Sequence, residues 1–253
     1  MEEQTKGLDK DGFIENLYSS KNIAPEFQGV VSAVIDSLLS GLPNQIDGIY
    51  LYGSVPRGTA VVGHSDLDVS IVLNTPISQK ENRVFKHFSD TIPKAYPQVS
   101  KLDIDPGCLS EILQPQEKFH WQFWLKHCCC CVWGNDLSIE FPQYKPSIEI
   151  AQALNGDLST FLEQMTPSFE SMSDADVTKV IGKKLVRAAY YFIAKKDGSW
   201  YTNLSQCTAV AKRYYPNQSD GIELAHQYAL GNLTSKTEAF ELYERLSTEL
   251  IRE

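Results

Sequence analysis

The sequence lacks any run of about 18 to 20 apolar residues, the length that a membrane-spanning helix requires. Its first residues, Met1-Glu2-Glu3-Gln4, are acidic and precede no apolar segment, so we expect no secretory signal and predict a cytoplasmic protein without membrane contact. Internal repeats are also missing. The remaining composition is that of an ordinary globular chain, with 253 residues of which 42% are hydrophobic and 22% charged.

Basic residues are scarce relative to acidic ones. Lys and Arg total 23 against 32 Asp and Glu, which gives a formal net charge of −9. A protein that binds nucleic acid by neutralising phosphates has the opposite balance, and no basic patch with interleaved aromatic residues occurs. We therefore predict no nucleic-acid partner. The acid excess suits a cationic or neutral small molecule, or a metal-bound nucleotide.

The sequence has six cysteines, and outside one run of consecutive cysteines it has no C-x-x-C pair. Four are consecutive, from Cys128 to Cys131, and the others are Cys108 and Cys207. Neighbouring residues of a strand point to opposite faces, so four in a row cannot form one tetrahedral metal site. We therefore predict six free thiols, with the run buried as small apolar residues.

Hydrophobic periodicity divides the chain near residues 140–147. Before this point, strands alternate with helices, and beyond Pro142 and Pro146 only helical patterns remain. The strands are predicted at 49–52, 67–73, 100–105 (closed by Pro106-Gly107) and 128–133, and the helices at 24–41, 78–94, 119–127, 148–165, 175–195, 203–214, 220–230 and 235–251. The predicted domains are 1–142 and 143–253.

Gly53-Ser54 ends the first predicted strand and begins a loop that can bind phosphate. Glycine lets the backbone approach a ligand closely, and a helix starting soon afterwards would add free N–H groups for an anion. Arg57 can contribute a bidentate phosphate contact. Ser65 lies at the end of the same loop and can assist.

Asp66 and Asp68 follow this loop, two residues apart and on one face of the next strand. In a cleft they repel each other unless a cation bridges them, and oxygen ligands beside a phosphate site fit Mg²⁺. A third carboxylate on a neighbouring strand would complete a site for two metal ions. Asp103 and Asp105 are both candidates, and we favour Asp103 because it lies in the middle of its strand.

The combination of Gly53-Ser54 and Asp66-Leu67-Asp68, separated by a short spacer, resembles the nucleotidyltransferase superfamily of the DNA polymerase beta type. The resemblance covers residues 24–140. It implies an α+β fold, in which a small mixed sheet flanked by helices forms the nucleotidyltransferase domain and an all-helical bundle follows. It also implies two Mg²⁺ ions on Asp66, Asp68 and Asp103, and a nucleoside triphosphate held by Gly53, Ser54, Arg57 and Ser65.

The segment from Gly182 to Tyr191 is similar to the helical domain of aminoglycoside adenylyltransferases that act on streptomycin and spectinomycin. Lys183 and Arg187 lie on one face of this helix. This face is either exposed to solvent or binds the triphosphate. One departure is that those enzymes place a functional Lys in a segment that corresponds to Ser199–Leu204, where this chain has none.

These resemblances imply an enzyme that moves a nucleoside monophosphate, AMP from ATP or its equivalent from another nucleoside triphosphate, to a hydroxyl group of a small acceptor. An aminoglycoside-like antibiotic is the first candidate acceptor, which would make the protein an antibiotic-resistance enzyme. Two alternatives stay open, namely an AMP-adding enzyme with a protein acceptor, as in antitoxins, and a non-catalytic nucleotide sensor. A monomer and a homodimer are both compatible with the sequence.

Overall fold

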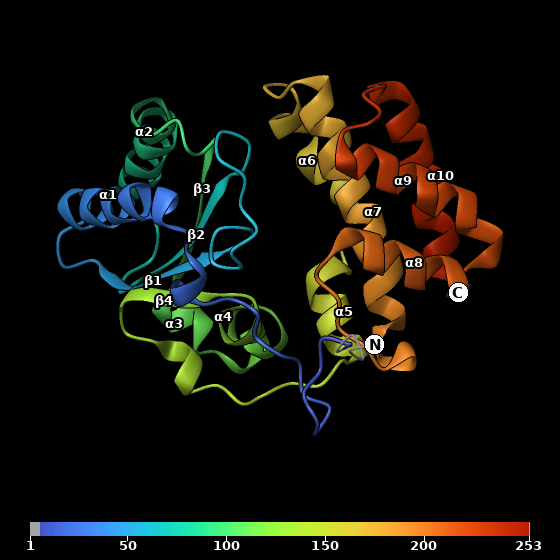
Figure 1. Cartoon of the computed structure of the whole chain (residues 1–253), viewed down its shortest axis with the longest axis horizontal. Helices are drawn as coiled ribbons and strands as arrows, with labels where there is room; N and C mark the ends of the chain where they lie inside the picture. Colours follow the sequence, from blue (N-terminus) through green and yellow to red (C-terminus); the bar gives the residue numbers. More distant parts are fainter. Residues whose placement is uncertain (1–5, 253) are drawn as a thin grey trace. The chain divides into compact units, whose positions relative to one another are not determined.

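The computed structural model describes residues 6–252, which divide into two compact units. One unit, Glu15–Tyr144, contains the sheet and the helices that flank it (Figure 1). The other combines residues 6–14 with 145–252 and consists of helices, apart from an isolated bridge between Leu8 and Ile14. The predicted α+β class is therefore confirmed.

A four-stranded mixed sheet forms the centre of the first unit. Its strands are β1 (Ile46–Tyr52), β2 (Leu67–Leu73), β3 (Leu102–Cys108) and β4 (Cys130–Gly134), in the order β3-β2-β1-β4. β2 pairs with β3 in parallel, whereas β1 is antiparallel to both β2 and β4. The bounds of β2 are those predicted from its alternation of apolar and polar residues.

The alternation in β2 assigns its side chains to two different cores. Leu67, Val69 and Ile71 are buried in the core that α1 (Pro25–Gly41) and α2 (Gln79–Ala95) cover. The opposite face packs against α4, and its core contains Tyr50, Val72, Ile112, Leu125, Cys129, Leu137 and Phe141. Figure 1 shows α1 and α2 on one side of the sheet and α3 and α4 on the other. Side chains alternate along a strand, so Asp68, four residues before Val72, lies on the same α4 face of the sheet as Val72.

Shorter elements complete the first unit. They are η1 (Ser20–Asn22), α3 (Leu109–Ile112), η2 (Pro115–Phe119), α4 (Trp121–His127) and η3 (Leu137–Ile139). The helix predicted over 119–127 therefore starts two residues late, after a 3-10 turn.

One predicted strand end is wrong. Pro106-Gly107 was expected to close the third strand, but β3 continues through both residues to Cys108. β3 is an edge strand, where a proline is tolerated because one side of the strand needs no ladder hydrogen bonds.

The second unit is a bundle centred on α7, which packs against α5, α8, α9 and α10. Its elements are α5 (Ile148–Asn155), α6 (Phe161–Phe169), α7 (Asp174–Asp197), α8 (Leu204–Tyr214), η4 (Pro216–Gln218), α9 (Ser219–Leu230) and α10 (Lys236–Arg252). The single helix predicted over 148–165 is two helices, because α5 stops at a C-cap glycine, Gly156.

The compact units differ from the predicted domains at the N-terminal end of the chain. The Trp200 N–H donates to the Lys6 carbonyl at 2.7 Å, and Gly7, at φ +72°, lies against the Trp200 carbonyl. The Lys145 ammonium lies 4.7 Å from the centre of the Phe13 ring. These contacts attach residues 6–14 to the helical unit, and the units divide at Tyr144 rather than at residue 142.

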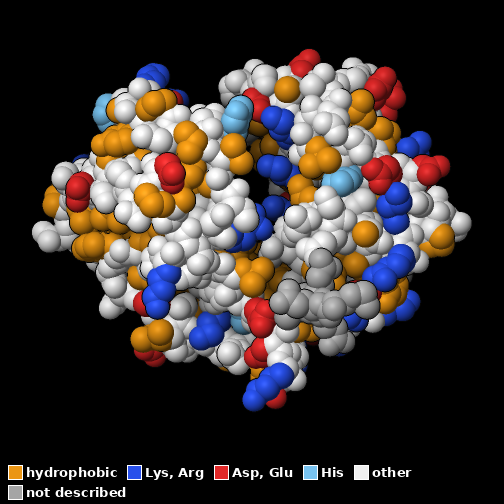
Figure 2. Space-filling model, viewed as in Figure 1, with side chains coloured by type: hydrophobic (Ala, Val, Ile, Leu, Met, Phe, Trp, Pro, Cys, Tyr) orange, Lys and Arg blue, Asp and Glu red, His pale blue; other side chains and the backbone are white. Residues whose placement is uncertain are grey.

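All six cysteines are free, as predicted. Cys128 and Cys129 are buried after α4, and burial raises the pKa of both Cys130 and Cys131 to about 11. Among residues 6–252, no helix combines the length and apolar character needed to cross a membrane. Acidic and basic side chains both appear on the visible surface of each unit (Figure 2).

Gly182 is the position at which the backbones of α7 and α9 meet. A Cβ atom there would lie 2.4 Å from both the Ala225 carbonyl oxygen and the Ala229 nitrogen. We expect Gly182→Ala to force the helices apart and to lower the free energy of unfolding by about 1–3 kcal/mol. Thermal unfolding followed by circular dichroism measures the effect.

Gly221→Ala is the matched control, because a Cβ atom at Gly221 in α9 meets only side chains at 3.6 Å or more. Its Tm is expected to stay the same or to rise slightly, since alanine is the better helix former. Equal Tm values for the two variants would show that α7 and α9 are not in backbone contact at Gly182.

Candidate active site

The Gly53-Ser54 loop lies directly against the carboxylate of Asp68. Gly53 has φ +77°, in the left-handed region that favours glycine, and a Cβ atom there would lie 1.9 Å from Asp68 Oδ2. Any other residue at position 53 would therefore collide with this carboxylate. The structure brings together two predicted site residues that are 15 positions apart in the chain.

Turns take the place of the helix that was considered after Gly53-Ser54. Residues 53–66 contain bends and turns only, and the next element is β2. The Thr59 N–H donates to the Ser54 carbonyl at 3.0 Å, which closes the loop. A helix N-terminus therefore contributes nothing to an anion site at this point of the chain, and any phosphate contact must come from the loop itself.

Arg57 belongs to the structure of the same loop. Its Nε donates to the Gly53 carbonyl at 3.0 Å, and its guanidinium lies 5.8 Å from the centre of the Tyr18 ring. These contacts hold the cation beside Gly53. Its predicted bond to phosphate stays a prediction.

Ser65 closes the turn that precedes β2. Its hydroxyl accepts from the Val61 N–H at 2.8 Å, and its carbonyl accepts from the Ser100 N–H at 3.0 Å. The contacts of Ser65 thus connect this turn to the start of β3. A direct contact between Ser65 and a phosphate is still a prediction.

The parallel pairing of β2 with β3 places the acidic residues side by side. Asp68 is the register partner of Asp103, and Ser70 is the partner of Asp105. Neighbouring strands are about 4.8 Å apart, so the Asp68 and Asp103 carboxylates leave the same face of the sheet as close neighbours. Asp66 lies just before β2, and its Oδ1 accepts from the Ser100 hydroxyl at 2.6 Å.

Asp105 lies one step further along the sheet, away from Asp66. Although the residue is exposed at the edge strand, loss of hydration around its carboxyl raises the pKa of Asp105, and the charge of His120 opposes the rise. The register makes Asp103, and not Asp105, the partner of Asp68, and the role of Asp103 as the third carboxylate stays a prediction.

Two aromatic residues that were not singled out as site residues lie beside the acids. Tyr52 is the register partner of Asp68 on β1, and its ring meets the Trp124 ring edge-on at 5.0 Å. Trp124 Nε1 donates to the Ser70 hydroxyl at 3.1 Å. Burial raises the pKa of Tyr52, and the nearby charges of Asp68, Asp105 and Asp103 raise it further. The Tyr52 phenol therefore stays neutral next to the carboxylates.

Lys101 is a further residue that was not singled out. Its ammonium pairs with Asp103 Oδ1 at 2.5 Å. Loss of hydration opposes the Lys101 charge, but the hydrogen bond and charge of Asp103, together with the charges of Asp66 and Asp68, raise its pKa overall. The alternation that places Asp103 and Asp105 on one face of the strand places residue 101 on that face too, so the sequence contained the information that Lys101 lies beside these acids.

The residues of this cluster fit Mg²⁺ in the type of their donor atoms. Within residues 6–252, no group of three or more His, Cys, Asp and Glu side chains is arranged to hold a metal ion. Mg²⁺ usually takes one or two protein carboxylates and completes its shell with substrate phosphates and water. The Lys101 ammonium pairs with Asp103, and the charges of Asp66 and Asp68 also favour its protonated form.

Lys183 and Arg187 belong to the other compact unit, where both are exposed on α7. The Arg187 charge reaches the thiol of Cys207, whose pKa burial raises to about 12 against this opposing effect. Contact of Lys183 and Arg187 with the nucleotide therefore stays a prediction.

The segment that lacks the expected Lys serves packing in the helical unit. Trp200 is buried and stacks on Tyr191 with 4.8 Å between ring centres. The Tyr190 hydroxyl lies 2.9 Å from that of Ser199 and accepts from the Tyr201 N–H at 2.7 Å.

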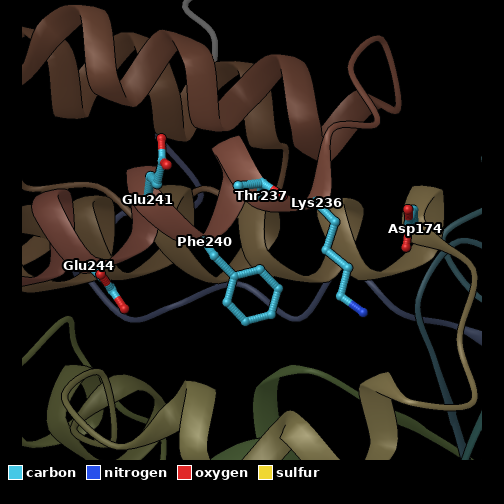
Figure 3. Close-up of a pocket in the computed structure, with 6 residues that line it drawn as sticks. All are labelled: Asp174, Lys236, Thr237, Phe240, Glu241 and Glu244. Atoms are coloured by element: carbon cyan, nitrogen blue, oxygen red, sulfur yellow. The ribbon is translucent and has the colours of Figure 1, made fainter.

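Two pockets in the helical unit contain none of the predicted site residues. The first has a volume of about 450 Å³ and is lined by Asp174, Lys236, Thr237, Phe240, Glu241 and Glu244. Figure 3 shows Lys236, Phe240 and Glu244 at successive turns of α10. The second has a volume of about 550 Å³ and includes Asn155, Phe192 and Tyr215 in its lining. Neither pocket is therefore the site of the predicted chemistry.

Comparisons with known proteins bear on the same residues. Residues 32–127 match the family model described as the nucleotidyltransferase domain. A search of the curated proteins found no significant match. Among solved structures, a crystal structure of spectinomycin adenyltransferase AAD(9) from Enterococcus faecialis with ATP and spectinomycin is similar to this chain, with 15% sequence identity and a TM-score of 0.56. The similarity covers 88% of this chain and 98% of that one, so the two share a fold.

Substitution of Gly53 tests the contact between the loop and Asp68. We expect Gly53→Ala to displace the Asp68 carboxylate and to lower nucleotidyl transfer by at least about 100-fold, as the loss of one positioned electrostatic group commonly does. Pyrophosphate release measures the activity. Gly63→Ala is the control, since it also has a positive φ, +75°, but its Cβ atom would meet only one atom, at 3.8 Å. Equal losses for both variants would contradict a specific role of Gly53.

Proposed function

We propose that this chain, whose residues 32–127 match the nucleotidyltransferase domain, transfers AMP from ATP to a hydroxyl group of a small acceptor in a Mg²⁺-dependent reaction. The observation that carries the proposal is the register pairing of Asp68 with Asp103 beside the Gly53 loop. This arrangement combines a carboxylate pair for metal-bound phosphates with a backbone that a phosphate can approach closely.

The proposed roles follow from the positions of the side chains. Asp66 and Asp68 would hold Mg²⁺, which stabilises the charge of the phosphates during transfer. The Gly53-Ser54 loop and Arg57 would bind the β- and γ-phosphates. Asp103 would accept the proton of the acceptor hydroxyl. The oxygen of that hydroxyl would bond to the α-phosphorus, while the bond from the α-phosphorus to the bridging oxygen of the β-phosphate breaks and pyrophosphate leaves.

The acceptor in this proposal is an aminoglycoside-like antibiotic. The structural neighbour is described as a spectinomycin adenyltransferase with ATP and spectinomycin, which supports ATP as the donor and a small molecule as the acceptor. The net charge of −9 suits a cationic acceptor. We further propose, from the sequence pattern, that Lys183 and Arg187 bind phosphate groups of the nucleotide.

Pyrophosphate release with ATP and Mg²⁺, measured against a panel of aminoglycosides, tests the proposed reaction. Release is expected with at least one drug, and Asp68→Asn is expected to lower it by at least about 100-fold because a metal ligand is lost. Asp36→Asn, which removes an exposed carboxylate from α1 of the same unit, is the matched control and should keep the activity.

The outcomes of this assay separate the proposal from its alternatives. Binding of ATP that depends on Mg²⁺ and Asp68, without release for any drug, would replace the antibiotic by a protein or another metabolite, or leave a nucleotide sensor. Absence of ATP binding would contradict the assignment of the site itself.

Comparison of Asp103→Asn with Asp105→Asn tests the identity of the third carboxylate. We expect Asp103→Asn to lower kcat by about 100-fold or more and Asp105→Asn to have a much smaller effect, because only Asp103 is the register partner of Asp68. Single-turnover rates at saturating ATP measure the difference. The reverse order of effects would assign the role to Asp105.

A further inference from the structure

The larger of the two pockets in the helical unit has a wall to which four helices contribute. These are α5, α7, α8 and α10, and the lining residues lie between Ile148 and Leu250, all within this unit. The volume of about 550 Å³ lies in the range of roughly 300–1,000 Å³ that is typical of small-molecule sites. Asp66, Asp68 and Asp103 belong to the other unit, so this pocket is a separate candidate for ligand binding.

The floor of this pocket is apolar and its mouth is polar. Leu158, Ile193 and Leu250 are buried and form the floor, whereas Gln152 and Lys196 are exposed at the mouth. A cavity of about 150 Å³ can hold one benzene ring. A volume of about 550 Å³ therefore has room for two fused rings with a substituent.

A buried amide, that of Asn155, also lines the pocket. Asn155 is the last residue of α5 and is only 4% exposed. Its carbonyl accepts from the Leu158 N–H at 3.2 Å, but its side chain makes no hydrogen bond to another residue in the described part of the chain. Buried polar side chains are nearly always hydrogen-bonded, so this amide indicates a ligand with a polar group at the same depth.

Lys196 is the one charged residue in the described lining of the pocket. Its ammonium lies 5.2 Å from the centre of the Tyr214 ring, which lines the pocket as well. The acid next to it in the chain, Asp197, is bonded to Arg213 at 3.1 Å and accepts from the Ser199 hydroxyl at 2.6 Å. The lining is therefore positive in a chain with a net charge of −9, and it favours an anion.

We propose that this pocket binds a small heteroaromatic carboxylate, a molecule of about two fused rings with a hydrogen-bonding ring atom. The rings would lie on the apolar floor beside Phe192 and Tyr214, and the ring atom would pair with the Asn155 amide. The carboxylate would pair with the Lys196 ammonium at the mouth. The proposal concerns the helical unit alone and does not depend on the proposed function.

Calorimetric titration of the full chain with indole-3-acetate tests this proposal. Indole-3-acetamide has the same rings without the charge, and 1-naphthaleneacetate has the charge without the ring N–H. Each should bind about fivefold or more weakly than indole-3-acetate, because a site rejects an analogue that leaves its polar group unpaired.

Two substitutions assign the contacts to their residues. Lys196→Gln should weaken binding of indole-3-acetate about fivefold or more and leave the affinity for indole-3-acetamide unchanged, because only the acid loses an ion pair. Asn155→Leu should weaken binding of indole-3-acetate to a similar extent and should not weaken binding of 1-naphthaleneacetate. Lys195→Gln is the matched control, since Lys195 is an exposed lysine of α7 outside the lining, and it should keep all three affinities.

The thermal stability of Asn155→Leu distinguishes a ligand contact from a structural one. Its Tm should stay the same or rise, because an apolar side chain of similar shape replaces a buried amide without a partner. A lower Tm would show that the amide is bonded within the folded chain and would overturn the proposal.

Three further outcomes would overturn the proposal. They are no binding of indole-3-acetate to the unmodified protein, equal affinities for the acid and its amide, and equal losses in Lys196→Gln and Lys195→Gln. Asp68→Asn should leave the affinity for indole-3-acetate unchanged, and loss of binding in this variant would place the ligand at the other unit instead.

Discussion

The parallel pairing of β2 with β3 is the constraint on which the candidate active site depends. It makes Asp68 and Asp103 register partners, although they lie on strands separated by the whole of α2. Gly53 completes the arrangement, because only a residue without a side chain leaves room for the Asp68 carboxylate. A shift of one residue in this register would turn Asp103 to the opposite face of the sheet, into the apolar core under α1 and α2.

The edge position of β3 has two consequences for the site. It lets a strand contain Pro106 without a lost ladder bond, which keeps β3 long enough to present both Asp103 and Asp105. It also leaves Lys101 exposed, where its ammonium pairs with the carboxylate of Asp103.

Much of the fold could be predicted because its signals are local. The alternation over 67–73 gave β2 its correct bounds. The glycine and aspartate pattern indicated a nucleotidyltransferase domain, and residues 32–127 match the model of that family. The wrong predictions concern features that depend on tertiary contacts with other segments of the chain. The strand end at Pro106 depended on which strand is at the edge, and the missing helix after Gly53 depended on turns that close on Ser54 and Val61.

The α+β class, the two faces of β2 and the pair Asp66-Asp68 could be predicted from the amino-acid pattern, because side-chain periodicity and glycine conformation are properties of short segments. The folded chain was needed to show that Asp103 is the register partner of Asp68, that Lys101 pairs with Asp103 and that residues 6–14 attach to the helical unit. Each of these contacts joins residues far apart in the chain, and strand register and packing select such contacts from many that the local pattern allows.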